Sequence, residues 1–165
     1  MYQIGDKIVH PMHGAGTVED IVTRKIDGEA REYYVLRLPS GGMVVMIPVA
    51  ASEKLGVRAV CDAPRAEAVL AAVETAETTM TANWNQRYRE NTQRIKSGDL
   101  DEVARVVKGL TLRERQQGLS TGERKMLHAA RNILLSELML ARGASYEQTE
   151  HELDCALKRA ARAEI

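Results

Sequence analysis

The spacing of hydrophobic residues divides the chain into two parts, and the change falls near residue 60. Before it, short apolar stretches alternate with turn residues, a pattern typical of β-strands. After it, apolar residues recur three and four positions apart, which predicts amphipathic helices. A run of strands followed by a run of helices predicts an α+β fold, with a β-domain over residues 1–60 and a helical domain over residues 61–165.

The first part predicts a small, closed or nearly closed β-barrel. Its apolar stretches are separated by turn-forming residues, and the stretches are Lys7–Val9, Gly16–Val18, Tyr33–Leu36 and Met43–Ile47. Asp27-Gly28 is a hairpin signal, because both residues tolerate a positive φ. A second hairpin is expected at Ser40-Gly41-Gly42. Short strands joined in this way are typical of small barrels, which leave at least one strand edge to cover or to use.

The second part predicts an all-α bundle of about five short helices. The residues expected at the helix starts are Pro64, Asn83, Asp99, Ser120 and Ser145. Ser120 with Glu123 three residues later forms a capping box. Ser97-Gly98 is expected to end the second helix. The threonine-rich residues 75–81 are expected to be either a linker between the first two helices or a weak helix end.

The composition fits a folded, soluble protein. Of 165 residues, 44% are hydrophobic and 28% are charged, while only 4% are aromatic, so the cores must consist mainly of aliphatic side chains. No stretch approaches the ~18 apolar residues of a membrane span, and the first residues lack the apolar run of a signal peptide. Cys61 and Cys155 fit no metal-binding or disulfide pattern. We therefore expect a cytoplasmic protein with two free thiols and with neither a metal nor another cofactor.

Charge is unevenly distributed along the chain. The formal net charge is zero, yet residues 83–142 hold twelve Lys and Arg against seven Asp and Glu. This surplus of five positive charges could neutralise DNA phosphates without regard to base sequence. Charge alone favours the alternative, which is a solvated helix surface with ion pairs along each helix.

Residues 10–16 are the stretch most like an enzyme site. His10 and His13 could supply two ligands to a metal, and Gly14 and Gly16 could approach an anion. No third ligand has convincing spacing, and no phosphate-binding Lys-Ser/Thr follows. The pattern is more typical of a glycine-bearing loop between two strands. No catalytic triad, zinc motif or pair of carboxylates is evident elsewhere, so we expect no enzymatic activity.

Trp84 is the one tryptophan of the chain, and its neighbours are polar: residues 81–91 read TANWNQRYREN. Two interpretations are open. By their spacing, Trp84, Tyr88, Asn91 and Ile95 share one helical face, so the two rings could anchor the bundle core. The arginines and amides around the ring suit instead a wedge that enters an unstacked base step of DNA. The residues alone do not choose between the two.

The order of motifs resembles that of the CarD/CdnL family of bacterial transcription factors over essentially the whole chain. The stretch G-D-x-I-V-x-P-x-x-G-x-G-x-V from Gly5 is similar to the start of the family's RNA-polymerase-interaction domain. Three later stretches are similar to the family's helical domain: N-W-x-x-R-Y-x-x-N from Asn83, S-G-D from Ser97 and R-x-x-G-L-S-x-G-E-x-x-M-L from Arg115.

This resemblance implies that the first domain is a Tudor-like or SH3-like barrel that binds the β subunit of RNA polymerase. Part of that contact would be the pairing of an exposed strand edge with the polymerase. The residues that match the family's contact positions are Arg24, Ile26 and Met46. Met46 departs from the arginine that family members carry here, just before Ile47-Pro48. One charged interaction with the polymerase would therefore be lost.

The resemblance also implies that the second domain approaches promoter DNA at the upstream edge of the transcription bubble. Trp84 would insert from the minor-groove side, Arg89 and Arg124 would hold the backbone, and Arg87 and Lys125 would assist. The implied function is a transcription regulator that stabilises the open complex and binds DNA without strong base preference. We expect a bacterial, nucleoid-associated monomer. The alternative is a protein–protein adaptor without direct DNA contact, in which Trp84 is buried.

Overall fold

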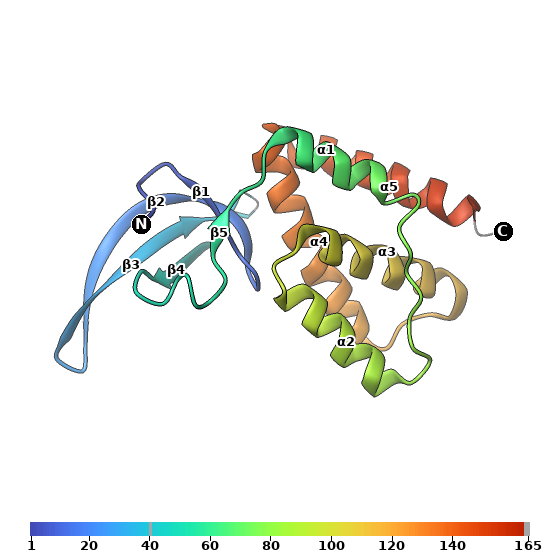
Figure 1. Cartoon of the computed structure of the whole chain (residues 1–165), viewed down its shortest axis with the longest axis horizontal. Coiled ribbons are helices and arrows are strands. Elements are labelled where there is room, and N and C mark those ends of the chain that lie inside the picture. Colours follow the sequence, from blue (N-terminus) through green and yellow to red (C-terminus); the bar gives the residue numbers. More distant parts are fainter. Residues whose placement is uncertain (40, 164–165) are drawn as a thin grey trace.

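The computed structural model describes residues 1–39 and 41–163, which form a five-stranded sheet followed by five helices (Figure 1). The strands are β1 (Lys7–His10), β2 (Gly14–Ile26), β3 (Glu29–Arg37), β4 (Val44–Pro48) and β5 (Arg58–Ala59). The helices are α1 (Ala63–Ala72), α2 (Trp84–Lys96), α3 (Leu100–Gln117), α4 (Thr121–Arg142) and α5 (Tyr146–Ala163). The predicted α+β class is confirmed.

The sheet is antiparallel and has the strand order β4-β3-β2-β1-β5. Asp27 and Gly28, with φ values of 52° and 80°, form the turn of the β2–β3 hairpin, as expected. Gly41 and Gly42 lie in the predicted connection between β3 and β4, whereas Ser40 of that turn lies outside the described residues.

The expectation of a closed or nearly closed barrel is not confirmed, because the described pairings leave β4 and β5 as separate sheet edges. Pro48 ends β4, and after Val49, whose N–H still donates to the Glu32 oxygen of β3, the following residues bond among themselves. The Ala51 N–H donates to the Pro48 oxygen and the Leu55 N–H to the Ala51 oxygen. The segment after β4 therefore forms turns instead of a strand. The short β5 finds its described strand partner in β1 alone.

The helices begin at the residues that their capping signals predict. Side chains of Asn83, Asp99 and Ser120 accept hydrogen bonds from backbone N–H groups in the first turns of α2, α3 and α4. Ser145 does the same just before α5. Pro64 lies in the first turn of α1, after the N-cap Asp62. Within the described part of the chain, no helix combines the length and the apolar character needed to cross a membrane.

Each half of the molecule has its own buried core. In the sheet the core consists of aliphatic residues around one tyrosine: Ile8, Val18, Tyr34, Leu36, Ile47 and Val57. The Tyr34 hydroxyl is satisfied by the backbone N–H of Tyr2, 3.0 Å away. The helical core is almost entirely aliphatic, and its fully buried members include Val106, Leu110, Leu134, Leu138 and Leu153. The low aromatic content of the chain is therefore reflected in cores built from small branched side chains.

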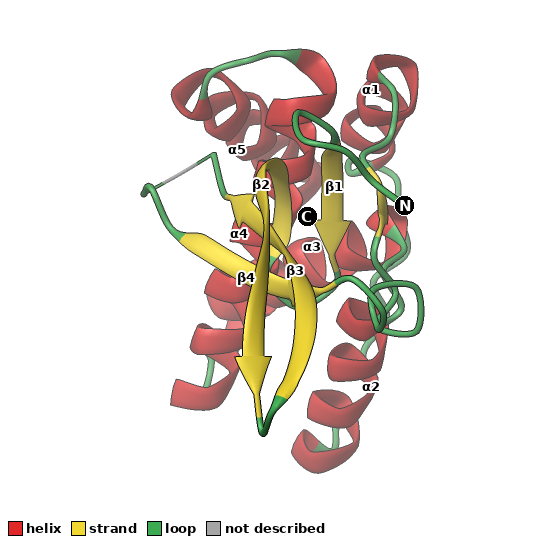
Figure 2. Cartoon of the chain, turned by 90° about the vertical axis from the view of Figure 1, so that its left-hand side faces the viewer, coloured by secondary structure: helices red, strands yellow, loops and turns green. Residues whose placement is uncertain are grey.

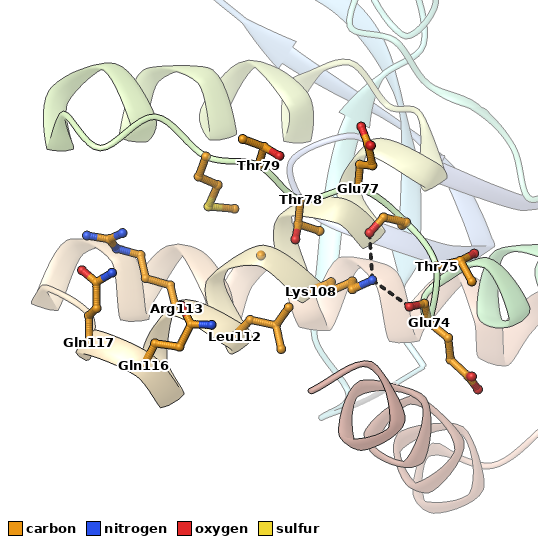
Figure 3. A pocket seen from close by; sticks show the side chains of 13 residues that line it. Glu74, Thr75, Glu77, Thr78, Thr79, Lys108, Leu112, Arg113, Gln116 and Gln117 are labelled. Carbon is orange, nitrogen blue, oxygen red and sulfur yellow. Dashed lines mark hydrogen bonds between the residues drawn. The ribbon is translucent and has the colours of Figure 1, made fainter. Parts of the chain in front are cut away.

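Residues 75–81 are neither helix nor strand, as expected for a linker, and this linker lies over α3 (Figure 3). Lys108 holds it there. Its ammonium group, in a side chain only 4% exposed, donates to the backbone oxygens of Glu74 at 3.0 Å and Ala76 at 2.8 Å. A polar cavity of about 500 Å³ remains between linker and helix. Lys108 is thus a structural residue and adds little positive charge to the surface.

The two histidines considered as metal ligands lie at the end of β1 and in the turn that follows it. The His10 Nδ1 accepts a hydrogen bond from the Met12 N–H at 3.1 Å, and the centroids of the His10 and His13 rings are 4.6 Å apart. Burial, helped by the nearby His13, lowers the pKa of His10. Among the residues the structure describes, no three His, Cys, Asp or Glu side chains are grouped to hold a metal.

The sheet and the helices meet along α4 (Figure 1). The Ala15 N–H donates to the Ser136 hydroxyl at 2.9 Å. Arg58 of β5 donates two hydrogen bonds to Glu137 of α4, at 2.6 and 2.8 Å, and two to the Gly98 oxygen in the α2–α3 turn. Glu137 is only 1% exposed. Because a two-pronged arginine–carboxylate pair fixes both distance and direction, this joint orients the two halves relative to each other.

Gly14→Ala tests the close approach of the sheet to α4. At Gly14, φ is 96°, and an added Cβ would lie 2.6 Å from the Ser136 Oγ and 3.3 Å from the Ile133 Cα. Backbone strain and overpacking together should lower the free energy of unfolding by about 3 kcal/mol. Gly5→Ala is the matched control, since Gly5 has a φ of 95° and nothing within 4 Å of an added Cβ. Equal losses for both variants in chemical denaturation would contradict the close approach.

Candidate nucleic-acid and protein interfaces

Trp84 lies at the start of α2 with much of its ring in solvent. The N-cap Asn83 fixes the first turn by accepting the Gln86 N–H at 3.0 Å. The Trp84 indole N–H donates to the Ser120 hydroxyl at 2.9 Å, and the ring stacks on Tyr88 with centroids 5.1 Å apart. Trp84 is 43% exposed and Tyr88 36%. The two rings are therefore held in place but do not belong to the bundle core, which removes the core-anchor interpretation.

The buried face of α2 consists of Arg87, Asn91 and Ile95. The core-anchor interpretation placed Trp84 and Tyr88 on one face with Asn91 and Ile95. Asn91 and Ile95 are buried, whereas Arg87 is buried in place of Tyr88. Arg87 can be buried because its donors are satisfied. It makes two bonds to the Glu123 carboxylate, at 2.9 and 3.0 Å, and donates to backbone oxygens at the end of the linker. A buried charge is tolerated only with such complete pairing.

Glu123 connects this buried pair to the indole. The Ser120 hydroxyl caps α4 by accepting the Glu123 N–H at 3.2 Å, and it lies 3.4 Å from the Glu123 carboxylate, to which it donates. Hydrogen bonds from Arg87 hold the pKa of the Glu123 carboxyl below its usual range, with smaller contributions from Arg113 and Ser120. A chain of contacts thus runs from Arg87 through Glu123 and Ser120 to Trp84.

Most of the basic residues between positions 83 and 142 are already engaged within the protein. Six form ion pairs: Arg87, Arg94, Arg105, Arg124, Arg131 and Arg142. Lys108 is buried at the linker, and Arg113 lies close enough to Glu123 to influence its pKa. Four are exposed and form no ion pair within residues 1–39 and 41–163: Arg89, Lys96, Arg115 and Lys125. The positive charge available to a partner is therefore smaller than the sequence count, and it is localised.

Two of these free cations share a groove with Trp84. The groove, of about 540 Å³, lies along α2 and is lined by Trp84, Asn85, Tyr88, Arg89, Thr92, Gln93 and Lys96. Arg124 and Lys125 are exposed in the first turns of α4, one turn beyond Ser120. Arg124 approaches Glu114 at 3.9 Å, a loose surface pair. Arg89 thus lines the groove of Trp84, and Arg124 and Lys125 lie in the first turns of α4, whose cap Ser120 binds the indole.

The strand register places Arg24, Ile26 and Met46 on one face of the sheet. Met46 pairs with Val35, and Val35 pairs with Asp20. Directly paired residues share a face, and side chains two apart in a strand do so as well. The face of Met46 and Asp20 therefore includes Arg24 and Ile26. The opposite face carries the buried core residues Tyr34, Leu36 and Ile47.

This outer face combines exposed apolar side chains with an arginine that lacks a partner. Ile26 and Met46 are each 43% exposed. Arg24 is paired in register with Arg31, and like charges directly opposite each other are unfavourable. Arg31 reaches Glu29 at 3.4 Å, whereas Arg24 has no ion pair among the described residues. An acidic group from another molecule would relieve this repulsion.

The same region offers free strand edges. β4 is an outer strand of the sheet, and β1 pairs with β2 only from Gly14 to Thr17. The β2–β3 hairpin extends beyond the other strands (Figure 2). Unpaired backbone donors and acceptors along such edges can accept an added strand.

Comparisons with known proteins agree with both halves. Residues 2–61 match the model of the CarD-like/TRCF RID domain, and residues 68–154 match that of the CarD C-terminal domain. A Bacillus subtilis protein named "Putative transcription factor YdeB" is 37% identical over 148 residues, which are 90% of this chain and 97% of that protein. The chain belongs to the CarD/CdnL family.

In this CarD-family protein, the structure brings together most of the predicted DNA-contact residues. Trp84 and Arg89 line one groove, and Arg124 and Lys125 lie beside the serine that holds the indole. Arg87 is different. Its side chain is 3% exposed and is bound to Glu123. Arg87 therefore holds α2 against α4 beneath the site and does not face solvent.

Two residues near Trp84 were missed by sequence reasoning. Lys96 stands seven positions after Arg89, and this spacing could have placed both on one side of α2. Ser120 was recognised only as a helix cap. Its bond to the indole joins residues 36 positions apart, and no local pattern carries that information.

Ser120→Ala tests whether this hydroxyl orients the CarD-family tryptophan. Loss of the cap should lower the free energy of unfolding by about 1 kcal/mol, and loss of the indole acceptor should free the ring. We expect lower fluorescence anisotropy of Trp84 and easier quenching by acrylamide.

Ser145→Ala is the matched control, because Ser145 caps α5 without touching Trp84. It should lower stability by a similar amount and leave the tryptophan emission unchanged. If both variants alter the emission equally, the Ser120 contact does not orient the ring.

Proposed function

We propose that this CarD-like transcription factor binds the β subunit of RNA polymerase through its sheet and promoter DNA through α2 and the start of α4. At the upstream edge of the transcription bubble it stabilises the open complex. The observation that carries the proposal is Trp84, a large apolar ring that is exposed, held by Ser120 and Tyr88, and lines one groove with the free cations Arg89 and Lys96. An exposed ring fixed in this way suits insertion at an unstacked base step.

Stabilisation follows from a difference in affinity. A factor that binds the melted promoter more tightly than the closed promoter shifts the equilibrium toward the open form by that difference. Trp84 fits only where bases are already separated, so its contribution arises mainly in the open complex. Arg89, Arg124 and Lys125 add phosphate contacts that do not depend on base sequence.

The sheet supplies the polymerase contact. We assign it to the Tudor-like class of the family's polymerase-interaction domain. Its outer face presents Ile26 and Met46 as apolar contacts and Arg24 as the group that meets an acidic side chain. An edge of β2 or β4 adds backbone pairing. Met46 cannot form an ion pair, so Arg24 carries the charged part of this contact.

The joint between sheet and helices couples the polymerase contact to the DNA contact. When the sheet is bound to polymerase, the helical domain is held at a high local concentration near the DNA. The Arg58–Glu137 pair limits the directions in which Trp84 can point. A weak DNA binder with zero net charge is then sufficient. In this proposal the protein acts as a non-enzymatic monomer in the bacterial cytoplasm, associated with the nucleoid through polymerase.

Trp84→Ala should shorten the open-complex lifetime that the protein confers. The loss of one stacking contact corresponds to about 1–3 kcal/mol, or roughly 5- to 150-fold. The measurement is promoter-complex dissociation with purified polymerase, with and without each protein. Trp84→Phe keeps an aromatic ring without the indole donor and should retain part of the effect. Full stabilisation by a folded Trp84→Ala protein would contradict the wedge.

Arg24→Glu should weaken binding to core RNA polymerase by at least roughly tenfold, because it replaces attraction to an acidic partner with repulsion. Lys25→Glu is the matched control, since this neighbouring residue makes the same charge change on the opposite face of the hairpin. Binding can be followed by surface plasmon resonance. Equal effects of the two variants would show that the outer face is not the docking surface.

A further inference from the structure

The groove beside Trp84 continues along the outer side of α2 to the end of that helix. The residues that line it recur at positions 84/85, 88/89, 92/93 and 96, which is one stripe of an α-helix. None of the residues of this stripe is buried, whereas Arg87, Asn91 and Ile95 form the buried face of the helix. α2 therefore separates a structural side from a side available to a partner.

The groove contains no carboxylate. Glu90, the one acidic residue of α2, turns away and accepts hydrogen bonds from Thr81 and Gln86. Arg94 is drawn toward Glu102 of α3 at 3.5 Å and does not line the groove. Arg89 and Lys96 remain free cations on an uninterrupted neutral-to-positive surface, which is complementary to a chain of phosphates.

We propose that this groove carries the sugar–phosphate backbone of the DNA strand whose base step Trp84 enters; the inference rests on the proposed function. Seven residues separate Arg89 from Lys96, a rise of about 10.5 Å along the helix. Phosphates of one strand are ~3.4 Å apart only in projection on the duplex axis and further apart along the strand itself, so the two cations can bind phosphates of nearby nucleotides on one strand.

Neutral donors line the same groove as the two cations. The amides of Asn85 and Gln93 and the Tyr88 hydroxyl face this groove, and none is engaged in a side-chain hydrogen bond within the described residues. Amide and hydroxyl groups of this kind commonly bind phosphate oxygens. Thr92 differs, because its hydroxyl already donates to the Tyr88 oxygen at 2.8 Å.

The groove also gives the strand a direction. It begins at Trp84 and ends at Lys96, just before the α2–α3 turn in which Gly98 accepts hydrogen bonds from Arg58 of the sheet. Figure 1 shows this end of α2 on the side of the helical domain nearer to the sheet. The strand therefore runs from the wedge back toward the polymerase-binding domain, instead of only across α4 past Arg124.

Lys96→Gln tests this path in the full-length protein. The probe is a fluorescently labelled fork-junction DNA, and binding is measured by fluorescence anisotropy from 25 to 100 mM salt. Loss of one phosphate contact should reduce the slope of log K against log salt by about 0.9 and weaken binding about tenfold at 50 mM salt. Lys96→Arg should behave like the parent protein.

Lys158→Gln on α5 is the matched control, since Lys158 is exposed, carries the same charge and lies outside the groove. If Lys96→Gln has the same slope and affinity as Lys158→Gln, the backbone does not follow α2. If Trp84→Ala still destroys open-complex stabilisation in that case, the proposed function stands and only the path fails. If Trp84→Ala retains stabilisation, the proposed function itself fails.

Discussion

A buried arginine–glutamate pair joins the first turns of α2 and α4, and the position of Trp84 depends on it. Arg87 and Glu123 are each almost completely shielded from water, so each needs the other to remain charged in the interior. Their contact fixes how the two helix starts lie side by side. Glu123 also holds the Ser120 hydroxyl, which binds the indole. Because the network is satisfied beneath the surface, the ring can be exposed without being mobile.

This arrangement would allow a protein without net charge to bind DNA, as we propose. Ion pairs within the helical domain involve most of its arginines, and two of the remaining free cations, Arg89 and Lys96, line the groove beside Trp84. The joint at Arg58 and Glu137 then orients this small positive surface relative to the sheet. In our proposal, affinity comes from two modest contacts made at once, and the preference for melted DNA comes from the shape of one side chain.

Much of the fold could be predicted from local signals. Asp27-Gly28 forms a hairpin and the capping residues start their helices, because the forces that act there involve only a few neighbouring residues. The open sheet was not predicted, since it depends on turns after Pro48 that replace a closing strand. One of the two open interpretations also placed Trp84 and Tyr88 on the buried face of α2, where Arg87 lies instead. An arginine is normally assigned to the surface, and the carboxylate that allows Arg87 to be buried lies 36 residues away. The family's sequence motif contains both residues but does not state that they touch.

The central claim is that Trp84 recognises separated bases. Because it is the one tryptophan of the chain, its emission reports directly on its surroundings. The decisive measurement is a titration of the full-length protein with fork-junction DNA and with fully paired DNA of the same sequence, followed by tryptophan fluorescence. The account predicts strong quenching and at least roughly tenfold tighter binding with the fork, which corresponds to about 1.4 kcal/mol from stacking. Equal affinity for the two DNAs, or an emission that does not change when the fork binds, would contradict it.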